Sequence, residues 1–159
     1  MRRFRQQLSE ESAREILSKC SNGVLSLVGE DGAPYGVPLS FAYDGEAAVY
    51  FHCALDGRKL DCIRHDRRCS FCVVGQDLIA PEEFTTHFRS VIVEGTVRIV
   101  EDSDEIMKGL MLLCDKYLPG VDPSAELSKY LSRVAVLRLD IQTLTGKEAI
   151  ELVRKRIGE

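Results

Sequence analysis

The sequence lacks the features that mark membrane, secreted and nucleic-acid-binding chains. Its longest apolar runs, such as residues 109–114, are far shorter than the roughly 20 residues that a helix needs to cross a bilayer. No apolar segment follows the opening Met1-Arg2-Arg3, so we expect no secretory signal and a cytoplasmic location. The formal net charge of −4 argues against a nucleic-acid partner, because such domains are usually basic.

Several common catalytic motifs are also missing. The chain has no P-loop, no GxGxxG fingerprint and no GxSxG nucleophile elbow. Its three histidines, His52, His65 and His87, form no HExxH pair. No metal site is therefore predicted, and neither phosphoryl transfer nor serine hydrolysis has a visible basis.

The six cysteines have one suggestive spacing, Cys69-Ser-Phe-Cys72. This CxxC lies in a run that reads as a strand, where positions three apart point to opposite faces. Without a second CxxC or a histidine pair at ligand spacing, buried and reduced thiols are expected. A redox or metal role is the alternative.

What is present describes an ordinary globular chain. The 159 residues are 45% hydrophobic and 29% charged, which excludes a disordered, collagen-like or coiled-coil chain. The length suits one domain over residues 1–159, large enough to bury a core without disulfides.

Hydrophobic periodicity and turn residues predict a mainly β fold. Strands are expected at about 24–28, 35–43, 47–53, 69–74, 88–100 and 134–141. Helices are expected after the caps Ser9 and Ser103, from Arg58 to about Asp66, and at about 123–131. Residues 75–86 read as a loop, and the tail after Gly146 as either a helix or a frayed end. Short turns between about six strands favour an antiparallel sheet that curls into a barrel or sandwich, with Gly95 as a bulge or bend.

The first local anomaly is a pair of cations at a helix start. Arg58 and Lys59 follow Gly57, although positive charge there opposes the helix dipole. A bound phosphate would reverse the sign, because backbone N–H groups, an Arg fork and a Lys ammonium all favour an anion. Two solvated cations on a helix shoulder are the alternative.

The second anomaly is a proline inside a predicted strand. Pro38 removes a ladder donor, which makes the strand an edge strand or introduces a bulge. Backbone groups freed in this way suit the polar edge of a planar heterocycle. A plain edge strand is the alternative.

Three stretches together resemble a known family: PYGVPLSF at 34–41, YFHCALDGRK at 50–59 and FRSVIVEG at 88–95. They are similar to the pyridoxamine 5′-phosphate oxidase-like flavin-binding split barrels, and among these to the Nim-type 5-nitroimidazole-resistance group. The opening Met1-Arg2-Arg3 and the later run LTGK at 144–147 resemble that group too. The resemblance covers nearly the whole chain. It implies a homodimer of Greek-key split β-barrels, each with six antiparallel strands, and FMN bound in clefts at the dimer interface.

The resemblance also implies roles for single residues. Arg58 and Lys59 match the phosphate-binding pair, and Val37 to Ser40 match the segment along the isoalloxazine ring. Phe51 and His52 match the strand end beside the flavin, and Ser90 a residue near the cofactor that the other subunit contributes. The implied cofactor-binding set is Val37, Pro38, Leu39, Ser40, Phe51, His52, Gly57, Arg58, Lys59 and Ser90.

Two departures narrow the implied chemistry. Phe88 stands where many relatives have Tyr, so any hydrogen bond from that hydroxyl is missing. The substrate-phosphate residues that pyridoxamine-phosphate oxidases carry near the C-terminus have no match, so vitamin B6 oxidation is not expected.

The resulting hypothesis is an FMN-dependent oxidoreductase that reduces a small aromatic acceptor such as a nitroimidazole or a quinone. His52 is the candidate catalytic residue, either orienting the flavin ring or donating a proton. The first alternative is a non-catalytic flavin- or haem-binding storage or sensor protein, with His52, His65 or Cys53 as possible iron ligands. The second alternative is a small antiparallel domain that binds no cofactor.

Overall fold

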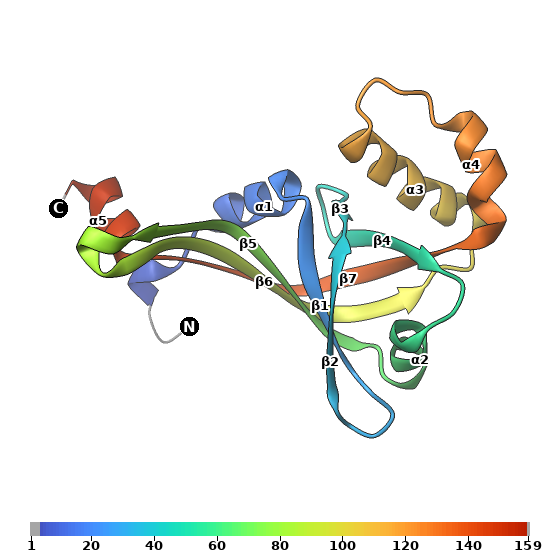
Figure 1. Ribbon diagram of the computed structural model, residues 1–159, viewed down its shortest axis with the longest axis horizontal. Helices are drawn as coiled ribbons and strands as arrows, with labels where there is room; N and C mark the ends of the chain where they lie inside the picture. Colours follow the sequence, from blue (N-terminus) through green and yellow to red (C-terminus); the bar gives the residue numbers. More distant parts are fainter. Residues whose placement is uncertain (1–3, 159) are drawn as a thin grey trace.

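The computed structural model describes residues 4–158, and within them seven strands form one antiparallel sheet (Figure 1). The strand order is β2-β1-β5-β6-β7-β4-β3. The strands are β1 (Asn22–Val28), β2 (Pro34–Ser40), β3 (Ala42–Tyr43), β4 (Ala48–Ala54), β5 (Arg68–Ala80), β6 (Thr85–Ile99) and β7 (Val134–Glu148). The α-helices are α1 (Glu10–Lys19), α2 (Arg58–His65), α3 (Ser103–Tyr117), α4 (Ser124–Tyr130) and α5 (Ile150–Ile157). Short 3-10 turns cover Phe4–Gln6, Pro81–Glu83 and Leu131–Arg133.

The two ends of this sheet belong to one stretch of chain, which closes the barrel. β2 pairs with β1 and β3 pairs with β4, and a single residue, Phe41, separates β2 from β3. The Phe41 amide donates to the Tyr117 hydroxyl oxygen at 2.9 Å, and that hydroxyl lies 2.8 Å from the Phe41 carbonyl oxygen. The predicted strand at 35–43 is thus one path broken at Phe41, which gives seven strands where six were predicted, and the mainly β antiparallel barrel is confirmed.

The barrel interior is filled by aromatic and branched side chains. Phe71 lies at its centre, edge to face with Phe41 at 4.9 Å and with Phe51 at 5.1 Å between ring centroids. Along β1 the buried residues Gly23, Leu25 and Leu27 alternate with exposed ones, as the two-residue period of a strand requires.

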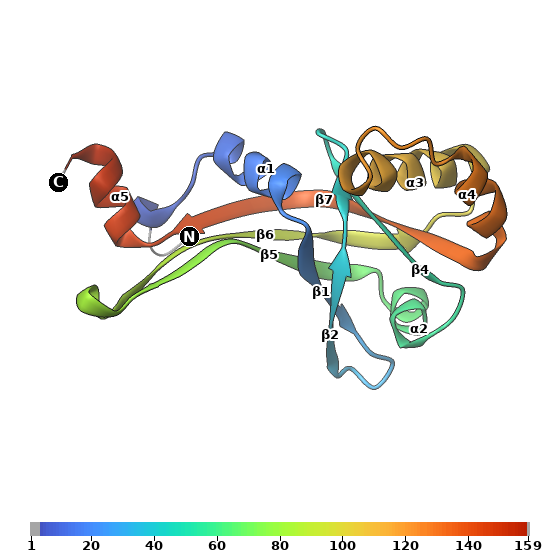
Figure 2. The ribbon, with the colours of Figure 1, turned by 45° about the horizontal axis from the view of Figure 1, so that its top comes forward.

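Residues 75–86 correct the sequence prediction, because they are not a loop. They form the outer part of the β5–β6 hairpin, in register from Gln76 opposite Arg89 to Ala80 opposite Thr85. The hairpin extends beyond the barrel as an arm (Figure 2). Neither face of the arm is fully covered, and Leu78 and Ile79 are exposed. A strand without one buried face lacks the alternating pattern that would reveal it.

Helix starts agree with the caps to within one residue. The Ser9 hydroxyl accepts from the Ser12 amide, as predicted. For α3 the predicted cap was wrong by one position: the Asp102 carboxylate accepts from the Glu105 amide, and Ser103 is the first helical residue. An Asp carboxylate competes well for this position. The short helix at 123–131 is confirmed as α4, and the tail contains the helix α5.

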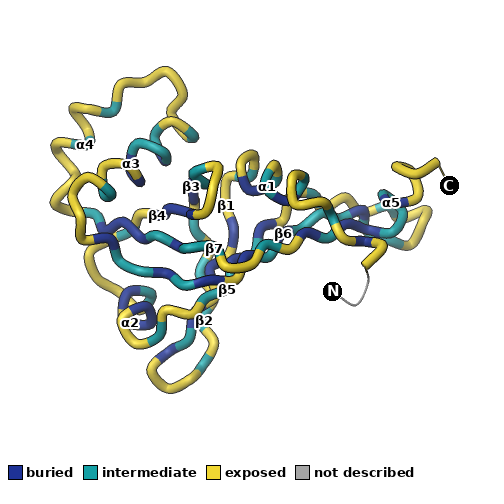
Figure 3. The backbone as a smooth tube through the Cα atoms, turned by 180° about the vertical axis from the view of Figure 1, so that it is seen from behind, coloured by how far each residue is buried: buried dark blue, intermediate teal, exposed yellow. Residues whose placement is uncertain are grey.

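Helix α3 packs on the outer face of β4 and β7. Gly109 allows this contact, since a Cβ there would lie 2.8 Å from the Tyr50 ring and 2.9 Å from Val136. Glu105 anchors the same helix by ion pairs of 2.7 Å to Arg98 and Arg138. In Figure 3 the segment from α3 through α4 is exposed along its outer side. Among residues 4–158, no helix is long and apolar enough to cross a membrane.

Candidate cofactor site

The start of α2 offers backbone N–H groups without partners. Its cap residue, Gly57, has a φ of 124° and no side chain with which to satisfy the helix end. The Leu60 amide bonds the Gly57 carbonyl at 2.9 Å, which leaves the Arg58 and Lys59 amides without a helical acceptor. No atom lies within 4 Å of where a Cβ of Gly57 would be, so the approach is open.

The side chains of Arg58 and Lys59 leave their charges available. The Arg58 guanidinium stacks over the Tyr35 ring, 4.6 Å from its centroid. Among the described residues, no carboxylate lies within ion-pairing distance of either cation, although Asp61 on the same helix pairs with Arg64 at 3.0 Å. Lys59 lies near the end of β4, where burial raises the pKa of the Cys53 thiol and the Lys59 charge opposes that shift. The donor set therefore fits a phosphate.

The β2 strand confirms the edge-strand interpretation of Pro38. Within the described chain β1 is its one full ladder partner, with Pro38 opposite Val24 and no register shift, so there is no bulge. Val37 and Leu39 are half-buried and pack on the barrel core, whereas Pro38 and Ser40 are exposed. Alternate residues of this segment therefore face the barrel core and the solvent.

Phe51 and His52 are neighbours near the end of β4, and their side chains lie on opposite faces of the strand. Phe51 is fully buried inside the barrel, while His52 is exposed on the opposite face. His52 and Ser40 both line a cavity of about 530 Å³ that α3 and α4 cover. The structure thus brings Ser40 and His52 to one cavity. Phe51 packs in the barrel core on the other face of β4.

Ser90 lies apart from this group. It sits in β6 opposite Val74 and Lys147, where the β5–β6 hairpin begins to extend away from α2 (Figure 1). One chain therefore does not bring Ser90 to Arg58. The Lys147 ammonium lies over the ring of the neighbouring Phe88, 5.2 Å from its centroid.

Comparison with known proteins identifies the family. The family model described as pyridoxamine 5′-phosphate oxidase matches residues 9–148, which is well over half of the chain. The chain belongs to this family. No curated protein matches it.

Solved structures agree with the barrel fold. A candidate 5-nitroimidazole antibiotic resistance protein from Bacteroides thetaiotaomicron is 18% identical over 89% of this chain and 86% of its own, with a TM-score of 0.75. A FAD and haem binding protein from Mycobacterium smegmatis is 22% identical over 91% and 73%, with a TM-score of 0.74. A FAD-binding protein from Mesorhizobium loti is 26% identical over 91% and 97%, with a TM-score of 0.65. This member of the family therefore has flavin- and haem-binding structural neighbours.

Sequence reasoning missed the cavity wall of this family member. Leu110, Leu113 and Tyr117 follow a helical stripe that predicts core packing, and the two leucines are indeed buried. The same side chains line the cavity beside His52. The sequence of α3 gives no sign that part of this stripe lines a cavity. The opposite wall comes from α4, and only the tertiary structure places α4 there.

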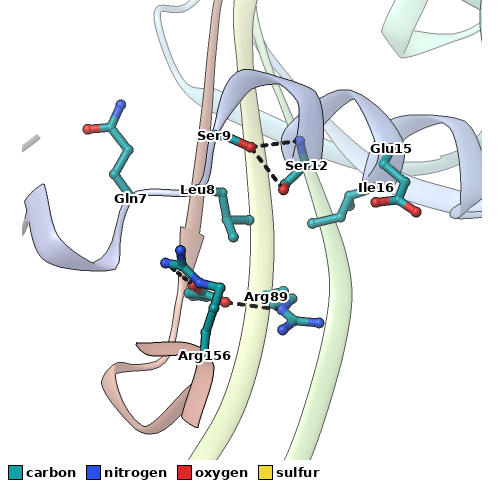
Figure 4. A pocket seen from close by; sticks show the side chains of 9 residues that line it. Gln7, Leu8, Ser9, Ser12, Glu15, Ile16, Arg89 and Arg156 are labelled. Carbon is teal, nitrogen blue, oxygen red and sulfur yellow. Dashed lines mark hydrogen bonds and ion pairs between the residues drawn. The ribbon is translucent and has the colours of Figure 1, made fainter. Parts of the chain in front are cut away.

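A second, smaller pocket lies between α1, β6 and α5 (Figure 4). Glu148, with 1% of its side chain exposed, pairs there with Arg89 at 3.2 Å and Arg156 at 3.0 Å. These ion pairs fasten α5 to the arm. Glu15 also lines this pocket, so its two carboxylates and two guanidinium groups cancel in formal charge. The pocket therefore favours neither an anion nor a cation.

The cysteine prediction is confirmed in part. All six cysteines are free, but Cys62 alone is fully buried among them and the others are half-buried. Burial raises the pKa of the Cys69 thiol to about 12. This thiol is therefore protonated at neutral pH, which disfavours disulfide exchange.

We expect Cys69 to resist alkylation in the native protein. With iodoacetamide at pH 8, modification of Cys69 should be at least about 10-fold slower than in urea-unfolded protein, because the thiolate is the nucleophile. Peptide mass spectrometry would measure both rates. Equal rates, or a recovered disulfide between Cys69 and Cys72, would restore the redox alternative.

Proposed function

We propose that the chain is an FMN-binding oxidoreductase that reduces a small aromatic acceptor, such as a nitroimidazole or a quinone. The observation that supports this best is the uncapped start of α2, where two free amides stand beside the unpaired charges of Arg58 and Lys59. Helix N-termini with adjacent cations favour phosphate groups. Membership of the family makes the phosphate of a flavin mononucleotide the natural occupant.

The neighbouring residues suit the ring end of such a cofactor. When bound, FMN would supply the redox chemistry, passing to the acceptor two electrons that a reduced nicotinamide provides. Pro38 and Ser40 expose one side of an edge strand, and Ser40 shares a cavity with His52. In this proposal the His52 imidazole orients the ring or passes a proton to the acceptor.

The proposed site needs a second copy of the chain. Ser90 lies at the base of the arm, away from α2, and so would reach the cofactor as Ser90 of the partner subunit. The arm also exposes apolar side chains, with Leu78 58%, Ile79 71% and Phe84 96% accessible. Exposed apolar groups gathered on one element are typical of protein–protein interfaces. We propose a homodimer with the cofactor at the interface.

An absorbance spectrum of the freshly purified protein tests the cofactor. A flavin spectrum, with FMN released on denaturation and identified by chromatography, is the expected result. Turnover of menadione or a nitroimidazole with reduced nicotinamide would then test the activity. A Soret band would favour the haem-binding alternative. A colourless protein that fails to bind added FMN would refute the proposal.

A further inference from the structure

We propose that Tyr35 is a positioning residue of the cofactor site, whose ring holds the Arg58 guanidinium in place for the phosphate. The inference rests on the proposed function, because it concerns the same phosphate. Tyr35 lies outside the set of residues that the sequence predicts to bind the cofactor. It contacts neither the flavin ring nor the acceptor in this proposal, and acts only through Arg58.

The contact joins the edge strand β2 to the start of α2. The guanidinium carbon of Arg58 lies 4.6 Å from the centroid of the Tyr35 ring. This distance is well inside the range of about 6 Å in which a cation is attracted to the negative face of an aromatic ring. A planar guanidinium also stacks on such a face. The ring therefore restricts an Arg side chain that is otherwise exposed at a helix end.

Tyr35 is itself held by the barrel. It lies in the β1–β2 ladder opposite the buried residue Leu27, and its half-buried side chain packs against the barrel core. A long Arg side chain loses rotamer freedom when it binds an anion. A support that packing has already fixed reduces that loss, because the Arg side chain is ordered before the ligand arrives.

The carboxylates near Arg58 explain why such a support is needed. The β1–β2 hairpin lies beside α2 (Figure 2), and Glu30, Asp31 and Asp61 line with Arg58 a pocket of about 540 Å³ between them. Asp31 accepts a backbone amide of its own turn at 2.9 Å, and Asp61 pairs with Arg64 at 3.0 Å. Among residues 4–158, no carboxylate forms an ion pair with Arg58. A guanidinium that turned towards these carboxylates would be neutralised and would bind phosphate less well.

Two flavins that differ only by the phosphate test the inference. Isothermal titration of the cofactor-stripped protein would compare FMN with riboflavin. We expect Tyr35→Leu to weaken FMN binding about fivefold, because the cation–π contact is lost, and to change riboflavin binding less than about twofold. Tyr35→Phe keeps the ring and should bind FMN as the wild type does. The matched control is Tyr43→Leu, since Tyr43 also has an Arg guanidinium over its ring, at 6.0 Å, but lies outside the proposed site.

A double-variant cycle separates positioning from a structural role. If Tyr35 acts through Arg58, Tyr35→Leu should cause no further loss of FMN affinity when Arg58→Ala is already present. Equal losses in both backgrounds, or an unchanged FMN affinity in Tyr35→Leu, would overturn the inference and leave the proposed function standing. If the wild type binds no FMN, the proposed function fails and this inference fails with it.

A second variant covers the case in which Tyr35→Leu does not fold. Pentafluorophenylalanine in place of Tyr35 keeps an aromatic ring of similar size for core packing, but fluorination removes the negative face that attracts the cation. We expect about the same fivefold loss of FMN affinity relative to Tyr35→Phe. Equal FMN affinities for these two variants would show that the ring does not hold Arg58 electrostatically, and the inference would be wrong.

Discussion

Removing both cations at the start of α2 is expected to weaken FMN binding by at least about 100-fold. A charge-assisted hydrogen bond contributes about 1.5–3 kcal/mol, and the variant Arg58→Ala/Lys59→Ala removes two donors of this kind. Their sum of about 3–6 kcal/mol corresponds to a factor of 10² or more in the dissociation constant. Isothermal titration of the cofactor-stripped protein with FMN would measure it.

The matched control removes two cations from the other end of the same segment. Arg64→Ala/Arg67→Ala changes the net charge equally, and both residues are exposed near the end of α2. We expect less than about a threefold loss of affinity there, because screened charges outside the site contribute little. If both double variants lose affinity equally, the effect is general electrostatics. If neither does, the phosphate does not bind at α2.

The second large effect is on stability, at Gly95. A Cβ at this position would lie 2.0 Å from the Asp140 carbonyl oxygen and 3.1 Å from its carbon, both backbone atoms of β7. The register between β6 and β7 shifts between Glu94, opposite Thr143, and Gly95, opposite Ile141, so the bulge predicted at Gly95 is confirmed. We expect Gly95→Ala to lower the free energy of unfolding by about 3 kcal/mol or more, measured by urea denaturation.

The comparison for this prediction is Gly36→Ala, also a glycine in a strand. Its Cβ would meet only the Val24 Cγ1 atom at 3.4 Å, which is near ordinary contact. We expect a change of less than about 1 kcal/mol. Similar stabilities for the two variants would show that β7 can move away from Gly95 at little cost.

The sequence predicted most of the barrel because its strands are covered on one side. In β7, Leu137 and Leu139 alternate with Arg138 and Asp140, and Gly32 and Gly45 mark turns, so both the period and the boundaries are visible locally. The arm was not predicted. Its strand residues, including Leu78 and Ile79, pair in a regular ladder but bury too little to be patterned.

The candidate site divides in the same way. Arg58 and Lys59 break a local rule about charge at a helix start, and Pro38 breaks one about strands, so both anomalies are visible without any structure. The placement of Ser40 beside His52 depends on the break at Phe41, where one strand path leaves β1 and joins β4. No local pattern encodes that crossing.

By itself, then, the sequence determined the antiparallel β class, the cations at α2 and the edge character of β2, because each follows from interactions within a few residues. The tertiary structure alone decided that Ser90 stands apart at the base of an exposed arm, and that α3 and α4 enclose a largely apolar cavity against His52. Those features depend on contacts between segments distant in sequence, such as Gly109 against Tyr50 and Tyr117 against Phe41. Their free energy comes from packing that only the closed barrel makes available.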